Sequence, residues 1–241
     1  MTTAVTQAPA ADTRHVDVLI AGAGISGIGS AYHLQEQCPG KSYLILEMQD
    51  SFGGTWKTHK YPGVRSDSDL YTFGYRFKPW LGAPIASAEE ILKYMGEVID
   101  ENGIDEHILY GHRIARCRWS SEDNLWTIEA TRLSDDAPVT VTCNFLWMCQ
   151  GYYDHEKPYI PDWKGMDSYQ GQFVHAQLWD PDTDYSGKRV LVIGSGATAA
   201  TVIPAFAEKA EHVTMLQRSP TYFFCSENKN ELADHLREIG I

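Results

Sequence analysis

The sequence predicts an α/β fold in which one strand–turn–helix unit occurs twice along the chain. Two observations support this: apolar runs end in glycine at residues 16–24 and again at 188–196, and helical periodicity follows both. Continuous apolar runs are typical of strands in a parallel sheet. Residues 112–145 change to a two-residue period, which predicts a β-meander inserted in the first domain.

The composition indicates a folded chain with few of the features that attract polyanions. Its 241 residues are 43% hydrophobic, enough for one or two domains. The formal net charge of −12 disfavours nucleic acid and anionic membranes as partners. No apolar run reaches the length of a membrane span. Five cysteines without metal-type spacing predict reduced, buried thiols in a cytoplasmic protein, and no metal.

The first unit begins with the strand at residues 16–24. Residues 25–38 then suit a helix, and residues 42–47 a second apolar strand that ends in Glu47. Together they make one βαβ unit. Farther along, Ser87 and Glu90 have capping-box spacing. The elements expected after this unit are a helix at 87–103 and strands at 112–119, 125–132, 139–145 and 146–151.

Residues 53–69, GGTWKTHKYPGVRSDSD, have neither helical nor strand periodicity. Their glycine, proline and charge content predicts a loop rather than a helix. Loops of this length are usually functional or disordered. Trp56 and Tyr61 argue against disorder, so we expect a functional loop.

Gly22, Gly24 and Gly27 form a GxGxxG turn, with Ser26 inside it, between the first strand and helix. The glycines permit a tight turn, close approach of a pyrophosphate, and close packing of helix on strand. Glu47 is placed to bind a ribose hydroxyl. These residues predict a Rossmann-like dinucleotide-binding domain; the alternative is a glycine-rich turn of an unrelated α/β protein.

The second unit repeats the turn as GxGxxA, followed by a helix at 197–210 and a strand near 212–216. Arg218 lies where a ribose-binding acid would otherwise follow the strand. A guanidinium binds a 2′-phosphate that a carboxylate would repel, so we expect a preference for NADPH; an ordinary surface charge is the alternative. The expected contacts are Gly194, Ser195, Gly196, Ala197, Thr198, Ala199, Gln217, Arg218 and Ser219.

Two dinucleotide sites, one with an acid and one with an arginine, predict FAD in the first and NADPH in the second. Hydride would then pass from nicotinamide to flavin, while the protein positions the two groups. The predicted architecture is therefore two Rossmann-like domains, an FAD domain with an inserted β-meander and an incomplete NADPH domain. A further helix is expected to begin within residues 227–241.

Five motifs in order resemble the class B flavin monooxygenases, and among them the Baeyer–Villiger monooxygenases of the ethionamide-activating type. They are GAGISG with its acid, GGTW, YPGVRSDSD, GSGATA and YQGQFVHAQLWD at residues 169–180. The last departs from the family's FxGxxxHxxxW only in Tyr169. The resemblance extends from about His15 over nearly the whole remaining chain.

The resemblance implies an FAD-dependent, NADPH-consuming monooxygenase whose C4a-peroxyflavin, formed with O2, oxygenates a small-molecule ketone or a soft nitrogen or sulfur. It implies that Asp67 is catalytic and orients an arginine, where a charge pair favours the developing anion; a turn residue is the alternative. The flavin contacts implied are Gly54, Thr55, Trp56, Arg65, Ser66, Asp67 and Ile114.

His175 and Trp179, four residues apart, invite a catalytic interpretation of the histidine. In the family this segment joins the FAD and NADPH domains. We therefore expect His175 to bond backbone across a hinge and to link binding to domain motion.

Family members are much longer, and their remaining part supplies an active-site arginine onto which neither Arg65 nor Arg76 maps. The alternatives are a truncated, non-catalytic nucleotide-binding fragment and an NADPH:flavin reductase or oxidase. An incomplete sheet would expose apolar surface and favour instability or association. The expected domains are a flexible leader at 1–14, an FAD-binding domain at 15–153, a linker at 154–185 and a truncated NADPH-binding domain at 186–241.

Overall fold

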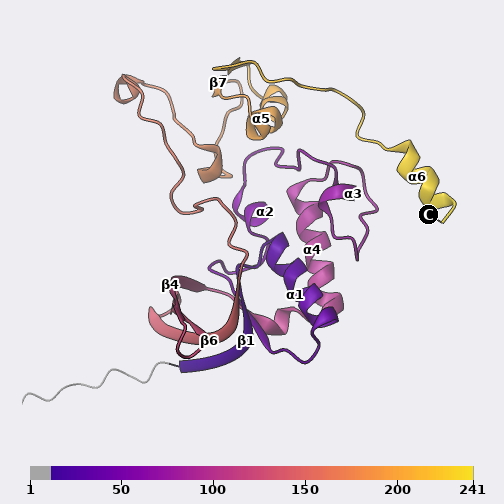
Figure 1. Ribbon diagram of the computed structural model, residues 1–241. Helices are drawn as coiled ribbons and strands as arrows, with labels where there is room; N and C mark the ends of the chain where they lie inside the picture. Colours follow the sequence, from indigo (N-terminus) through magenta and orange to yellow (C-terminus); the bar gives the residue numbers. More distant parts are fainter. Residues whose placement is uncertain (1–11, 241) are drawn as a thin grey trace, which may run out of the picture. The chain divides into compact units, whose positions relative to one another are not determined.

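The computed structural model describes residues 12–240 and is a mixed α/β structure (Figure 1). Its contacts divide the chain into two units. The first contains residues 1–54 and 95–152, and the second contains residues 55–94 and 153–241. Residues 1–11 of the expected leader lie outside the described part, whereas residues 12–14 belong to a strand. The expected boundaries of the nucleotide-binding domains stay a prediction.

The first unit contains one six-stranded sheet with the order β3-β2-β1-β6-β5-β4. Strands β1, β2, β3 and β6 pair in parallel, and β5 pairs antiparallel with both β4 and β6. The parallel part confirms the βαβ unit, and the antiparallel part confirms the inserted meander. The strands are β1 (Asp12–Ala21), β2 (Tyr43–Leu46), β3 (Ile108–Leu109), β4 (His112–Ser120), β5 (Leu125–Arg132) and β6 (Ala137–Met148).

The long helices agree with the sequence prediction. Helix α1 (Ile25–Gln37) connects β1 to β2, and α4 (Ala88–Asn102) follows the predicted capping box. The Ser87 backbone N–H donates to Glu90 Oε2 over 2.8 Å, and the Glu90 N–H donates to Ser87 Oγ over 3.2 Å. These bonds satisfy helix donors that would otherwise lack a partner.

Two predicted strands are one strand in the structure. The sequence predicts separate elements at residues 139–145 and 146–151, but β6 continues to Met148 because no turn breaks it. It can do so because β5 pairs with its first half while β1 pairs along most of its length. The expected burial of residues 146–151 is also wrong, since Met148 is 54% exposed.

The second unit has a two-stranded parallel sheet, β7 (Arg189–Ile193) and β8 (His212–Leu216), with α5 (Ala197–Ala207) between the strands in sequence. One face of this sheet contributes to a core around Val202 and Phe206. Its other face is open: Leu191, Ile193 and Leu216 are 48–55% exposed. The expected exposure of apolar sheet surface is confirmed.

The loop at residues 53–69 contains helical turns that sequence reasoning missed. Helix α2 (Thr55–Thr58) lies within it, and α3 (Leu70–Phe73) follows it. TWKT holds neither glycine nor proline, and Asp69 Oδ1 accepts the Thr72 N–H over 2.9 Å as an N-cap. Short 3₁₀ turns complete the structure at η1 (Asp105–His107), η2 (Met166–Ser168) and η3 (Ala176–Leu178).

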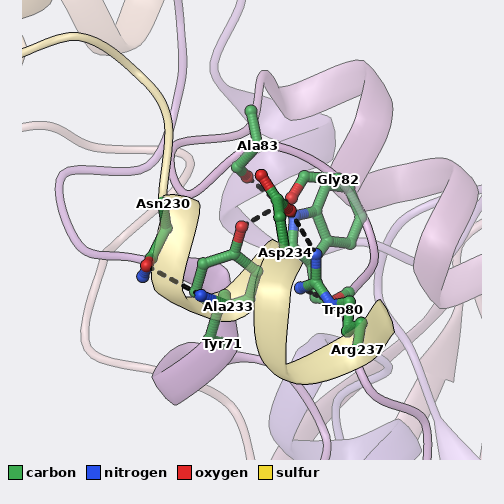
Figure 2. Close-up of polar contacts among 8 residues, drawn as sticks. All are labelled: Tyr71, Trp80, Gly82, Ala83, Asn230, Ala233, Asp234 and Arg237. Atoms are coloured by element: carbon green, nitrogen blue, oxygen red, sulfur yellow. Dashed lines mark hydrogen bonds and ion pairs between the residues drawn. The ribbon is translucent and has the colours of Figure 1, made fainter. Parts of the chain in front are cut away.

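The predicted final helix is α6 (Glu231–Glu238), capped by Asn230, which accepts the Ala233 N–H (Figure 2). Side chains attach its segment to residues 71–85 of the same unit. Arg237 Nη2 donates to the Trp80 carbonyl over 2.9 Å, and its guanidinium lies 4.8 Å from the centre of the Tyr71 ring. Asn228 donates to the Ile85 carbonyl and accepts its N–H.

Among the helices of residues 12–240, none is both long and apolar enough to cross a membrane. The same residues contain no group of three or more His, Cys, Asp or Glu side chains arranged to hold a metal.

All five cysteines are free thiols, but Cys38 and Cys225 are exposed, so the expected burial is wrong for these two. Cys143 is buried, which raises the pKa of its thiol to about 11.

Candidate functional site

The first glycine turn is sterically closed at two of its positions. Gly22 has a φ of +101°, and a Cβ on it would lie 2.8 Å from the Cys149 carbonyl oxygen. A Cβ on Gly27 would lie 1.9 Å from the Gly22 oxygen, which no side chain can tolerate. The predicted tight turn and close helix–strand packing are therefore present in the geometry.

Gly24 stands at the N-terminus of α1, and no side chain caps that helix. The GGTW glycines run beside it: the Gly53 N–H donates to the Ala23 carbonyl over 3.0 Å. A Cβ on Gly54, whose φ is +54°, would lie 3.3 Å from Gly24 Cα. Residues of two separate sequence motifs thus meet at one helix N-terminus, where backbone N–H groups favour an anion.

Glu47, the predicted ribose ligand, is 6% exposed at the end of β2. Its Oε2 accepts the Ala23 N–H over 2.7 Å, and its Oε1 accepts the Gln49 N–H over 2.8 Å. The carboxylate is therefore fixed beside the glycine turn, and each oxygen keeps a lone pair for a further donor. Ser26 is exposed on α1, and Ile114 packs against the core of this unit.

The second glycine turn is open. Gly194 has a φ of +130°, Gly196 is the N-cap residue of α5, and a Cβ on either would meet nothing within 4 Å. No side chain caps α5. Ser195 Oγ accepts a hydrogen bond from Thr221 over 2.6 Å. Ala199, in the third motif position, is buried within the unit.

The residues after β8 project from the second unit. Gln217, Arg218 and Ser219 are all exposed. Gln217 Nε2 contacts Met215 Sδ at 2.7 Å, whereas the Arg218 guanidinium makes no hydrogen bond or ion pair within the described residues. Ala197 and Thr198 begin α5. Of these side chains, the Arg218 guanidinium is thus open to a ligand, and its expected preference for NADPH stays a prediction.

An unexpected connection joins the loop at residues 53–69 to the helix of the second glycine motif. Tyr61 is 8% exposed, packs with Val202 and Phe206, and hydrogen-bonds Thr198. A Cβ on Gly63, whose φ is +76°, would lie 3.2 Å from the Thr201 oxygen on α5. No local pattern reports this packing, because Tyr61 and α5 are more than a hundred residues apart in the sequence.

Asp67 is exposed and accepts no hydrogen bond within the described part of the chain. The turn-forming carboxylate of this segment is Asp69 instead. Ser66 is buried, with its N–H donating to the Ala86 carbonyl over 2.8 Å. Arg65 is exposed and lines an open cleft of about 450 Å³ with Ile85 and residues 87–90. Trp56 meets Phe73 edge-on, with ring centres 5.9 Å apart.

The segment with His175 and Trp179 makes contacts inside the second unit. His175 Nδ1 accepts the Gln177 N–H over 3.2 Å and so caps η3 locally. Trp179 packs on Phe206 and Tyr185, with ring centres 5.5 and 6.0 Å away. Within the described residues, the backbone bond of His175 is therefore local, and its hinge role stays a prediction.

Two family models match the sequence. A NAD(P)-binding Rossmann-like domain matches residues 20–80, and a flavin-binding monooxygenase-like family matches residues 85–231. The latter covers the meander, the YxGxxxHxxxWD segment and the second glycine turn.

Curated and solved proteins agree with these matches. The chain is 52% identical over 212 residues to the FAD-containing monooxygenase EthA of Mycolicibacterium smegmatis, covering 87% of this chain and 43% of that protein. Cyclohexanone-bound cyclohexanone monooxygenase is similar with a TM-score of 0.78 and 25% identity, over 94% of this chain and 44% of that one. OTEMO in complex with FAD and NADP has a TM-score of 0.75 and 32% identity, over 92% and 43% of the two chains. The chain thus spans less than half the length of these proteins.

Proposed function

The chain belongs to the flavin-binding monooxygenase-like family, and we propose that it carries the FAD and NADPH sites of a flavin-dependent monooxygenase. The observation that supports this best is the pair of glycine turns, each opening a helix that no side chain caps. An acid follows the first turn and an arginine follows the second, as FAD and NADPH require.

The residues present fit FAD in the first unit. The α1 N-terminus, Gly24 and Gly54 leave a surface of backbone at which a pyrophosphate can approach without meeting a Cβ. Glu47 is held by two backbone N–H groups, so its remaining lone pairs face a ribose hydroxyl in a fixed direction. Because this carboxylate is already ordered, binding would cost little side-chain entropy.

The residues present also fit NADPH in the second unit. The open turn at Gly194 and Gly196 leaves room for a pyrophosphate at the N-terminus of α5. Arg218 offers a guanidinium with no competing partner in the described residues, and a 2′-phosphate would bind its fork. NADPH is therefore the preferred nicotinamide cofactor.

When bound, the two cofactors would supply hydride transfer and the activation of O2 for insertion into a small substrate. In this proposal the chain's own residues bind and orient: Glu47 holds ribose, Trp56 packs beside the flavin, and Asp67 presents an uncommitted carboxylate. Asp67 would hold an arginine in place, and the positive charge of that arginine would favour the anion that develops during the reaction. His175 and Trp179 would transmit domain motion.

We propose a ketone, or a soft nitrogen or sulfur centre, as the group that is oxygenated. Support comes from the cyclohexanone-bound monooxygenase, which has a similar fold over 94% of this chain. A cytoplasmic setting belongs to the same proposal, since none of the cysteines forms a disulfide.

The test uses the longest available form of the protein that contains this chain. We expect purified protein to retain FAD by its absorbance, anaerobic NADPH to bleach it faster than NADH, and oxygen then to convert a ketone or sulfide to product. Glu47→Ala should remove FAD, and Arg218→Ala should remove only the preference for NADPH. Stoichiometric hydrogen peroxide without product would indicate a reductase or oxidase instead, and protein that never retains FAD would contradict the proposal.

A further inference from the structure

Three histidines lie together in the second unit, and the proposed function uses only His175 among them, as a hinge residue. His59 directly follows α2, His155 lies in the segment after β6, and His175 precedes η3. His59 is only 6% exposed. The ring centres of Tyr153 and His155 lie 5.2 and 6.4 Å from its own. The cluster therefore joins the loop at 53–69 to the segment that leads toward the second glycine motif.

Two ring nitrogens in this cluster have no partner among residues 12–240. His59 Nε2 and His155 Nδ1 are buried and make no hydrogen bond with any of these residues. Buried polar atoms are nearly always paired, so two orphans in one cluster require an explanation. A protonated His59 would carry a positive charge and an N–H donor at Nε2, and this donor has no acceptor among the described residues. The contacts therefore suit a neutral ring.

The groups that face His59 do not compensate a positive charge. Its ring neighbours are Tyr61, Tyr153 and His155. Burial, followed by the nearby His155 and His175, holds the pKa of His59 below its usual value. Lys57 and Lys60 lie on its own segment, and neither is among the groups that shift the pKa of His59.

The acidic residues of the facing segment are directed elsewhere. Asp154 Oδ1 accepts the backbone N–H groups of Glu156 and Lys157 over 3.1 and 3.0 Å. The Glu156 carboxylate is on an exposed residue, and neither acid is among the groups that shift the pKa of His59.

His59 lies directly before the residues that pack on α5. Tyr61, two residues on, bonds Thr198 in the first turn of α5, and Gly63 lies against Thr201. A displacement of His59 would therefore disturb the packing of the YPG segment on the helix that opens the second glycine motif.

We propose that His59 is a proton-sensitive positioning residue, whose neutral ring holds residues 59–63 and 153–155 together and whose protonation releases them. The release itself depends only on this cluster. Its consequence, weaker NADPH binding at mildly acid pH, rests on the proposed function.

The experiment measures hydrogen exchange of the 241-residue chain without nucleotides between about pH 8 and pH 5, the range in which histidine changes charge. Rates are corrected for the intrinsic pH dependence of exchange. We expect residues 59–63 and 153–155 to lose protection as the pH falls, while α1 and β1 keep theirs. His59→Phe, which keeps a ring but cannot be protonated, should abolish this loss. His212→Phe, the same change at an exposed histidine of β8, should leave it unchanged.

Equal loss of protection in the native chain and in His59→Phe would overturn the proposal. If that variant does not fold, NMR titration of the native chain decides: a His59 ring that titrates like free histidine contradicts the proposal, and one that titrates lower, together with local exchange, supports it. FAD retention is measured separately. A pH-dependent release in protein that never binds nucleotides would reject the proposed function and keep the inference.

Discussion

The two glycine turns share one sequence pattern but differ in what surrounds them. In the first unit, Gly22 and Gly27 lie between β1 and the first turn of α1, and a Cβ on either would meet backbone atoms. In the second, Gly194 and Gly196 have open space around them, and the two-stranded sheet leaves one apolar face exposed. Packing therefore requires the glycines of the motif in the first unit, whereas in the second unit only the backbone conformation of Gly194, with its φ of +130°, requires one.

Because of this difference, variants of the two turns can distinguish an effect on folding from an effect on nucleotide binding. A change in the first turn damages the fold and the binding site together, so its effect on activity cannot be interpreted alone. Alanine at Gly196, where φ is −81°, should leave the folded chain almost unchanged and report on the nucleotide, whereas a side chain at Gly194 would be strained by its φ of +130°. Variants in matched pairs, one from each turn, therefore test the comparison directly.

The largest difference should come from alanine at matched glycines. Gly27→Ala places a Cβ 1.9 Å from the Gly22 oxygen, so we expect a loss of about 3 kcal/mol or more in unfolding free energy. Gly196→Ala meets no atom within 4 Å and has an ordinary φ of −81°. It should change stability by less than about 1 kcal/mol, in the stabilising direction if at all.

Urea denaturation of both variants measures this pair. Similar losses of stability in the two variants would show that the open environment of the second turn is filled in solution. In protein that binds NADPH, Gly196→Ala should still weaken binding, because the Cβ occupies the space that the pyrophosphate needs.

Much of the fold could be predicted from the sequence because the patterns that predict it are local. Glycine turns, apolar runs and the Ser87–Glu90 capping box are local signals, and the structure confirms each. The continuity of β6 was missed because it depends on two neighbouring strands at once, which a local pattern does not report.

In the candidate site, too, the residues set by local sequence patterns could be predicted, and the contacts between distant segments could not. Gly22, Gly24 and Glu47 could be found from spacing, because the glycine turn is contiguous and the acid follows it by about 20 residues at the end of the next strand. The packing of Tyr61 on α5 could not, since the two segments are more than a hundred residues apart in sequence. The roles of Asp67 and His175 stay predictions.

The second pair of variants compares Glu47, which follows β2, with Arg218, which follows β8. Glu47→Gln replaces one carboxylate oxygen by an N–H₂ group that faces a backbone N–H, so we expect a loss of about 2 kcal/mol. Arg218→Gln alters an exposed side chain and should change stability by less than about 0.5 kcal/mol. Thermal unfolding gives the first quantity. The ratio of NADPH to NADH affinities should fall about tenfold or more in Arg218→Gln only. An unchanged ratio would show that Arg218 is an ordinary surface charge.

The third test uses alkaline pH, to which the first unit should respond through Tyr43. Burial raises the pKa of Tyr43 to about 12. Above pH 10 the unfolded chain loses this phenolic proton while the folded chain keeps it, so the stabilisation present below pH 10 is lost as the pH rises. We expect about 1 kcal/mol less stability by about pH 11.

Tyr43→Phe should reduce this alkaline dependence without abolishing it, because burial also raises the pKa of Tyr110 in the same unit. The variant should be slightly less stable at neutral pH, since Gln35 Nε2 loses its 2.9 Å contact with the hydroxyl. Denaturation at a series of pH values measures both effects. An alkaline slope identical to that of the native chain would show that Tyr43 is accessible to solvent.

The smallest effect should come from the attachment of α6, because it involves few contacts at the surface of the second unit (Figure 2). Arg237 donates to the Trp80 carbonyl over 2.9 Å and to Asp234 over 3.1 Å, while it lies on the Tyr71 ring. Arg237→Ala should cost less than about 1 kcal/mol globally, since exposed ion pairs and cation–π contacts are individually weak.

Locally the same variant should have a clear effect, because α6 has no fully buried residue to hold it in place. Hydrogen exchange of residues 231–238 should therefore increase in Arg237→Ala, and less so in Arg237→Lys, which keeps the charge but loses the fork. Arg132→Ala, which breaks an exposed pair with Asp135 in the first unit, should leave α6 unchanged. If exchange of α6 is already complete in the native chain, these contacts do not hold it, and the weak attachment extends to the whole segment after β8.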